Sequence, residues 1–177
     1  QKLTNTGEIL AVNDVNSAGA DVTNNGKIAS NNRILLDNSK IANTGEILSG
    51  DISMQNVQKF DNNGTIKANN TVLTTTQDIN LTGNLHGEQR LAISGRNITN
   101  NGNTTGTGLI QITSNDFTNN HDLSSDTVII NGQGNIVNNA IITGDSGKIS
   151  GNDITNNDLV AFEKYLEINA QNKVQNN

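Results

Sequence analysis

Apolar residues recur at every nineteenth position of this chain, and each opens a short polar phrase. The clearest copies read LTNTGEIL, VTNNGKIA, IANTGEIL and FDNNGTIK. The spacing is constant as far as residue 117 and continues in steps of 19, 18 and 20; the opening residues are Leu3, Val22, Ile41, Phe60, Ile79, Ile98, Phe117, Ile136, Ile154 and Val174. A repeat of this length predicts a solenoid, in which each unit buries its apolar face only against its neighbours.

Further apolar positions within each repeat predict strands. Six residues after the opening residue the chain is apolar again in nearly every repeat, with Thr104 as the exception. A second run follows, in which apolar residues alternate, as in Leu91 and Ile93 or Ile110 and Ile112. Alternation with a period of two is typical of strands. We therefore expect two or three short strands in each repeat.

Asparagine and glycine form two further columns in the repeat. Asn stands two residues after the opening residue in every repeat but one, where Leu81 replaces it. Gly stands four residues after it in the first six repeats, and His121, Ala140 and Asp158 take that place later. Because Asn and Gly both tolerate positive φ, the pair indicates a turn.

The phase of this turn distinguishes two architectures. An antiparallel meander would alternate two kinds of turn, whereas here one turn signal recurs once per repeat. The pattern favours an all-β fold, a parallel β-helix of about nine 19-residue coils over residues 1–177, right-handed by the usual chirality of parallel crossovers. Stacking would place Asn5, Asn24 and Asn43 in an amide ladder. It would also place Ile47 inside, between Ile28 and Ile66.

Composition narrows the class of function. The chain has no Cys, a net charge of -6, and only 11 basic residues along about nine repeats. Nucleic-acid binding requires clustered Lys and Arg, so we expect no nucleic-acid partner. No apolar run reaches the roughly 18 residues needed to span a membrane. Since the sequence starts and stops inside repeats, we expect a single β-helical segment of a longer array.

The repeat resembles a known family. An apolar-x-Asn-x-Gly-x-Ile phrase with a period of 19, followed by a short aliphatic strand, is similar to the haemagglutinin repeats of filamentous haemagglutinin. It also resembles the shafts of contact-dependent inhibition toxins and other two-partner secretion exoproteins. The resemblance covers the whole chain and is strongest over residues 3–78.

The resemblance implies a secreted or bacterial cell-surface rod, exported through an outer-membrane transporter. Its role would be adhesion, or presentation of a toxin or receptor-binding part to a host or target-cell receptor or glycan. Two other functions are weighed against this: a discrete receptor- or glycan-binding module, and a β-helical polysaccharide-degrading enzyme. Repeats within one residue of 19 leave no long loops to shape a substrate cleft, so we expect no enzymatic activity.

Acidic residues in the later repeats are the main candidates for chemistry. Asp126, Asp145 and Glu163 occupy one position of the repeat. If stacked, they could bind Ca²⁺ or act as an acid/base pair on a glycan; otherwise they are solvated turn residues, which we favour. His86 and His121 are isolated and make no metal constellation. We therefore assign no catalytic, cofactor-binding or metal residue and no cofactor.

The segment 158–173 differs from the other repeats because it holds Phe162 and Tyr165, two of the four aromatic residues. It could be a longer final coil with one extra residue. Alternatively, it could be a protruding loop or short helical turn whose aromatic rings bind a partner or a sugar ring.

Overall fold

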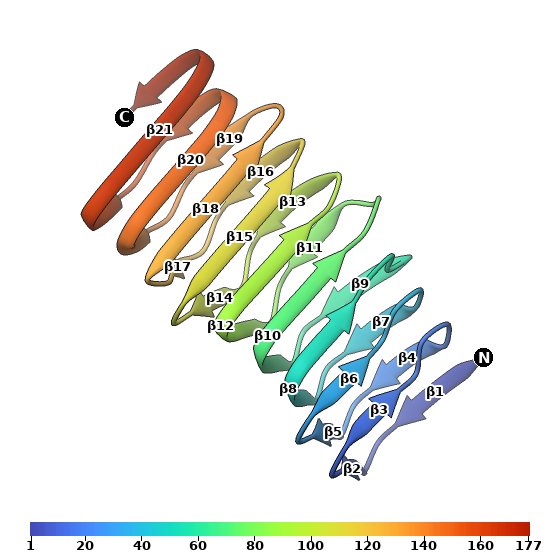
Figure 1. Cartoon of the computed structure of the whole chain (residues 1–177). Helices are drawn as coiled ribbons and strands as arrows, with labels where there is room; N and C mark the ends of the chain where they lie inside the picture. Colours follow the sequence, from blue (N-terminus) through green and yellow to red (C-terminus); the bar gives the residue numbers. More distant parts are fainter.

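A computed structural model describes residues 1–177 and contains strands but no helix. The strands wind into about nine coils stacked along one axis, with the two termini at opposite ends (Figure 1). Every strand pair is parallel, as in β1–β4, β12–β15 and β20–β21. The predicted parallel β-helix is therefore confirmed, and the antiparallel meander is wrong.

Each coil contributes to three faces. The first face begins with β1 (Lys2–Asn5), β4 (Asp21–Asn24), β7 (Lys40–Asn43), β9 (Lys59–Asn62), β11 (Ile79–Leu81), β13 (Asn97–Asn100), β16 (Asp116–Asn119) and β19 (Ile136–Asn138). The second face contains β2 (Glu8–Ala11), β5 (Lys27–Ser30), β14 (Asn103–Gly106) and β17 (Leu123–Ser124). The third contains β3 (Asp14–Asn16), β6 (Arg33–Leu35), β15 (Leu109–Ser114) and β18 (Thr127–Gly132).

Some strands run through more than one face. The second and third faces are joined by β8 (Glu46–Met54), β10 (Thr65–Thr74) and β12 (Asn84–Ser94). The last two strands, β20 (Ile142–Asn156) and β21 (Val160–Asn176), pass through all three faces. Only the coils built by β20 and β21 therefore run through all three faces without a break.

The predicted apolar columns form the core. The opening residues stack coil on coil, for example Val22 on Ile41 and Ile154 on Val174. The second column runs in the same way, and Ile47 pairs with Ile28 on one side and Ile66 on the other. Ile47 is fully buried within one cluster of 29 apolar residues. The register predicted from the spacing is confirmed for these columns.

The asparagine ladder is also present, and it lies inside the rod. The Nδ2 atoms of Asn5, Asn24 and Asn43 each donate to the Oδ1 atom of the next ladder residue, over 2.8 Å. A second run links Asn100, Asn119, Asn138, Asn156 and Asn176 in the same direction. The interior members are fully buried or nearly so, and buried amides of this kind must be paired. The ladder satisfies them and holds the coils in register.

The ladder breaks at Leu81, and the exceptional Thr104 compensates for the break. With Leu81 in the column, no amide below is available to donate to Asn100 Oδ1. The Thr104 hydroxyl takes that role and donates to Asn100 Oδ1 over 2.9 Å. Leu81 and Thr104 are both buried, so the apolar and polar groups have exchanged columns. The two departures from the repeat are therefore one structural feature, which we call the ladder fault.

A second amide ladder runs along the surface, one residue beyond the first. It joins Asn101, Asn120, Asn139, Asn157 and Asn177, with Nδ2–Oδ1 distances of 2.6–2.9 Å. Here each amide donates to the residue nearer the N-terminus, opposite to the buried ladder. In the early coils threonine alternates with asparagine in this column, and the Thr44 hydroxyl donates to Asn25 Oδ1 over 2.8 Å.

The glycine column has a different cause from the one predicted. Positive φ occurs only at Gly19, Asn38 and Asn56, none of which belongs to the column. Instead, a Cβ added to Gly45 would overlap the carbonyl oxygen of Gly26 in the coil below, and one added to Gly64 would overlap that of Gly45. The column is glycine because the turns of successive coils approach too closely for a side chain. The interpretation based on positive φ is wrong.

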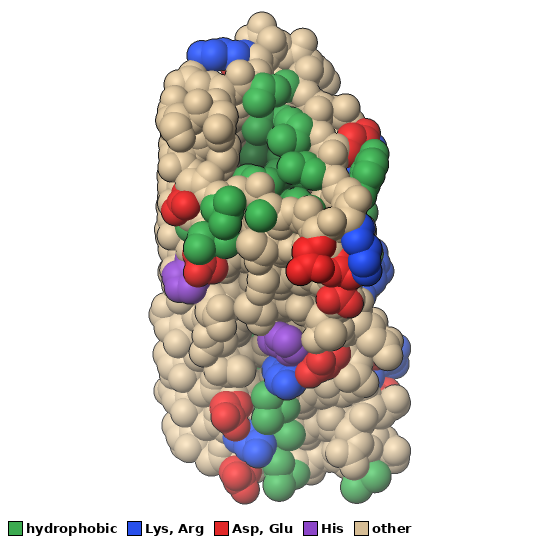
Figure 2. Space-filling view, turned by 90° about the vertical axis from the view of Figure 1, so that its left-hand side faces the viewer, with side chains coloured by type: hydrophobic (Ala, Val, Ile, Leu, Met, Phe, Trp, Pro, Cys, Tyr) green, Lys and Arg blue, Asp and Glu red, His purple; other side chains and the backbone are tan.

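The last coil leaves part of the core uncovered. Figure 2 shows hydrophobic side chains gathered in a hollow toward one end of the rod. At the C-terminal end, a cavity of about 160 Å³ lies among the core residues, beside Leu166, Ile168 and Val174. The exposed fractions of these three side chains are 39%, 40% and 54%. Their partners in the coil below, which include Ile149 and Ile154, are buried.

Candidate functional site

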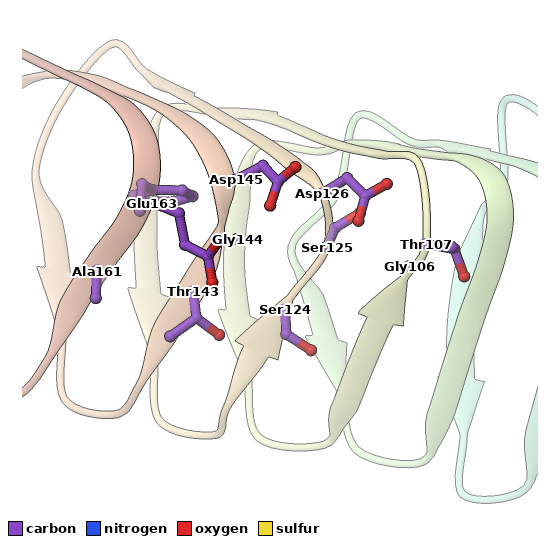
Figure 3. Close-up of a pocket in the computed structure, with 11 residues that line it drawn as sticks. Gly106, Thr107, Ser124, Ser125, Asp126, Thr143, Gly144, Asp145, Ala161 and Glu163 are labelled. Carbon is purple, nitrogen blue, oxygen red and sulfur yellow. The ribbon is translucent and has the colours of Figure 1, made fainter.

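A hollow on the side of the rod lies at the predicted acidic positions. Its volume is about 540 Å³, and we call it the acidic hollow; it is lined by Gly106, Thr107, Ser124, Ser125, Asp126, Thr143, Gly144, Asp145, Ala161, Phe162 and Glu163 (Figure 3). Its origin is local. Thr105 pairs with Ser124, a full repeat further on, but Leu109 pairs with Thr127, one residue short of a full repeat. The coil is therefore one residue shorter here, and two lining glycines add no bulk.

Asp126 and Asp145 occupy neighbouring coils at this hollow. The Asp145 backbone N–H donates to the Asp126 carbonyl over 2.9 Å, and the Asp126 N–H donates to the Thr107 carbonyl over 3.2 Å. These two members of the predicted column are therefore stacked. Stacked like charges raise each other's energy unless a cation lies nearby.

That cation is Lys164. Gly144 pairs with Phe162 but Ser146 pairs with Tyr165, so β21 carries one extra residue opposite Asp145. The extra residue brings the Lys164 ammonium onto the Asp145 carboxylate. The hydrogen bond and charge of Asp145 raise the pKa of Lys164. The same irregularity displaces Glu163, whose carboxylate lies on the Thr143 side in Figure 3. The three predicted residues thus line one hollow but do not form one column.

This arrangement does not resemble a metal site. No group of three or more His, Cys, Asp or Glu side chains in the chain is placed to hold a metal ion. The Asp145 carboxylate contacts an ammonium group, and Asp126 has no hydrogen bond to a side chain that could serve as a base or nucleophile. What the hollow offers is a polar depression with net negative charge and one half-buried aromatic ring.

The aromatic segment forms the last coil, not a protruding loop. Residues 160–176 are the continuous strand β21, so the loop or helical turn is wrong and the longer final coil is confirmed. The Phe162 ring lies where a side chain at Gly147 would be and packs against the core. Tyr165 is 56% exposed, and its hydroxyl donates to Glu167 over 2.9 Å. The Glu167 carboxylate raises the pKa of Tyr165.

His86 is less isolated than its place in the sequence indicates. It lies in β12, half-buried, with Nδ1 2.9 Å from Thr105 Oγ1 and Nε2 3.3 Å from Glu88. Lys67, which pairs with His86 in the coil below, lies 3.0 Å from the same carboxylate. Hydrogen bonds from Lys67, Thr107 and His86 lower the pKa of Glu88. Lys67, His86 and Thr105 lie one repeat apart in the sequence, and this spacing is a signal that could have predicted the cluster. His121 is an exposed residue whose carbonyl accepts from Asn100.

A second hollow, of about 530 Å³, lies on the third face near the N-terminal end, beside Arg33, Asp51 and Asn70. Its polar side chains are paired with each other or with neighbouring coils. Arg33 Nη2 is 3.3 Å from Asp14, and the Asn70 amide donates to Asp51 over 2.8 Å. These pairs connect successive coils and stabilise the stack.

Comparison of the chain with protein-family models, with curated proteins and with solved structures found no match. No helix of the structure is long and apolar enough to cross a membrane.

Proposed function

We propose that this chain is a structural rod segment of a large secreted, surface-displayed bacterial exoprotein. It acts as a stalk, serving adhesion or presenting a toxin or receptor-binding part at a distance from the producing cell. Export through an outer-membrane transporter and display at the surface belong to the same proposal. An extended chain crosses a pore as a thread, and a coil that folds on its neighbour can then form outside.

One observation carries the proposal: the coils are nearly uniform in length and in register from end to end. Register shifts amount to single residues, for example at Ala68/Asn70, at the acidic hollow and in β21. No coil inserts a loop that could enclose a substrate, and binding sites for small molecules are usually concave and enclosed. The uniform geometry instead maximises length, since each coil adds roughly 4.8 Å.

Matched deletions test the spacer role. Removing residues 22–59 or residues 117–153 takes out two coils from different parts of the rod while keeping the phase of the columns. Each variant is anchored to a surface at one end and carries a small binding domain at the other. We measure capture of ligand-coated beads through a polymer layer of adjustable thickness.

A spacer predicts equal loss of reach, roughly 10 Å, for both deletions. If only the deletion of residues 117–153, which removes most of the acidic hollow, abolishes capture of the beads, the chain is a binding module. If neither deletion changes reach, the stalk role is wrong.

The alternative of a receptor- or glycan-binding module has one observation in its favour, namely the acidic hollow with its half-buried Phe162 ring. Binding of the purified chain to target cells or an immobilised glycan array, lost on changing Phe162 to Ala, would support this alternative. A stalk without its own ligand predicts no binding in either assay.

A further inference from the structure

Four Asn-Gly pairs occur in the chain, at residues 25–26, 63–64, 101–102 and 131–132. Asparagine is a chemically labile residue, and glycine after it leaves the side chain open to attack by the next backbone nitrogen. We propose that Asn25 is a site of spontaneous intramolecular deamidation and that the Thr44 hydroxyl promotes the reaction. This inference is independent of the rod function.

The reaction needs only water. The Gly26 nitrogen gives up its proton to solvent and forms a bond to Cγ of Asn25. The Cγ–Nδ2 bond breaks, and Nδ2 leaves as ammonia after taking up a proton from solvent, which gives a cyclic succinimide. Water then opens the ring at one of its two carbonyls to give aspartate or isoaspartate. The product carries one more negative charge than the starting chain.

The attacking nitrogen is the first feature that separates the four sites. A backbone N–H that donates a hydrogen bond is held in place and gives up its proton less readily. Gly64 N–H donates to the Asn43 carbonyl over 3.1 Å, whereas Gly26 and Gly102 N–H have no acceptor. Asn131 lies within β18, with neighbouring strands on both sides that hold its backbone extended. The sites at residues 25 and 101 are therefore the more reactive ones.

The side-chain amide separates the remaining two sites. Asn101 Nδ2 donates to Asn80 Oδ1 over 2.7 Å, and its Oδ1 accepts from the Asn120 amide over 2.9 Å. Ring closure at Asn101 therefore breaks the hydrogen bond of the leaving nitrogen and moves a rung of the surface ladder. Asn25 Nδ2 has no hydrogen-bond partner, and the side chain is exposed. Loss of ammonia from Asn25 therefore costs no contact within the protein.

The Thr44 hydroxyl lies where negative charge develops. It donates to Asn25 Oδ1 over 2.8 Å, and this oxygen becomes the oxyanion when nitrogen attacks Cγ. A hydrogen-bond donor placed at a developing oxyanion lowers the barrier. The Thr82 hydroxyl lies 2.9 Å from Asn63 Oδ1, but it also lies 2.7 Å from the Asn62 carbonyl oxygen, and the Gly64 nitrogen is occupied. Only Asn25 combines a free nitrogen, an unbound leaving group and a donated hydroxyl.

The test is a time course of the purified chain at mildly alkaline pH, with proteolytic peptides that contain each Asn-Gly pair analysed by mass spectrometry. The urea-unfolded chain gives the intrinsic rate at each site. Relative to these rates, we expect Asn25 to react first, Asn101 next, and Asn63 and Asn131 to stay protected. If Asn63 or Asn131 keeps pace with Asn25 in the folded chain, the assignment is wrong.

Substitutions at Thr44 test the hydroxyl. Thr44→Val should slow deamidation of Asn25 several-fold in the folded chain but leave the unfolded rate and the Asn101 rate unchanged. Thr44→Ser keeps the hydroxyl and should restore the rate. Equal rates for the Val and Ser variants would refute the role of Thr44. Faster reaction of Thr44→Val at all four Asn-Gly sites would indicate that the substitution unfolds the turn, and this outcome would also overturn the role of the hydroxyl.

Discussion

The ladder fault makes a quantitative prediction about Thr104. In Thr104→Val the hydroxyl is replaced by a methyl group of similar size, so packing is kept. Asn100 Oδ1 loses the hydroxyl that donates to it, and a buried acceptor without a partner costs about 1–3 kcal/mol. The added apolar group recovers roughly 0.8 kcal/mol. The net expectation is a loss of about 0.2–2 kcal/mol in the free energy of unfolding.

Leu81→Asn should remove the cost of that substitution. An asparagine at position 81 would restore the column, accepting from Asn62 and donating to Asn100. The change alone sacrifices the burial of a leucine, about 1.5–3 kcal/mol, against two hydrogen bonds of roughly 0.5–1.5 kcal/mol each. In the Leu81→Asn background, however, Thr104→Val no longer leaves Asn100 without a donor. We expect a coupling energy of about 1–2 kcal/mol between the two positions.

The assay is equilibrium urea unfolding of the four proteins of this cycle, followed by circular dichroism. Thr71→Val is a matched control, because Thr71 is as fully buried as Thr104 but its hydroxyl has no hydrogen-bond partner. The same chemical change there should stabilise the chain by roughly 1 kcal/mol. If the effects of Leu81→Asn and Thr104→Val on the free energy of unfolding add within about 0.5 kcal/mol, Thr104 does not compensate for Leu81. Equal effects of Thr104→Val and Thr71→Val would refute the compensation as well.

Four further expectations concern other parts of the stack. Ile47→Asp buries an unpaired charge and should cost several kcal/mol, while the exposed Thr44→Asp should change the melting temperature little; equal effects would mean that the register is wrong. Gly45→Ala should destabilise the fold by about 3 kcal/mol or more, whereas Gly7→Ala, with open space around the residue, should be nearly neutral. Similar effects of the two substitutions would contradict close approach of successive turns as the cause of the glycine column. The pKa of Glu88 is lowered in the fold, so its carboxylate stabilises the chain above the unfolded pKa, and this stability is lost as pH falls through the folded pKa. Glu88→Gln should therefore flatten the acid side of a profile of melting temperature against pH. An acid side that is unchanged in the variant would refute this role of Glu88. Incubation with polygalacturonate, chitin, hyaluronan or peptidoglycan should leave each polymer intact, and reproducible cleavage would place the chain among enzymes.

Most of the fold could be predicted because the sequence shows the two periods on which the fold depends. A spacing of 19 sets the columns, and alternation with a period of two sets the inward side of each strand. Both hold in the structure, as the pairing of Ile28, Ile47 and Ile66 illustrates. The ladder of amides followed from the same phase.

The remainder depends on contacts that no single period records. The partnership of Leu81 with Thr104 links different columns of different coils. Lys164 reaches Asp145 only because β21 gains a residue at that point, which a strictly regular repeat does not contain. The cause of the glycine column was missed because φ tolerance and absence of a side chain select the same residue, and only the distance between turns tells them apart.

The regular ladders have a consequence for how such a chain can change over generations. Where every coil presents the same rung above and below, one whole repeat can be gained or lost by recombination without disturbing its neighbours, so the length of the rod is free to drift. At the ladder fault this freedom ends. Leu81 has to be inherited with Thr104, since a recombination event that keeps Leu81 but loses the Thr104 hydroxyl leaves a buried amide oxygen without a donor. The fault therefore marks a fixed point in an otherwise interchangeable array.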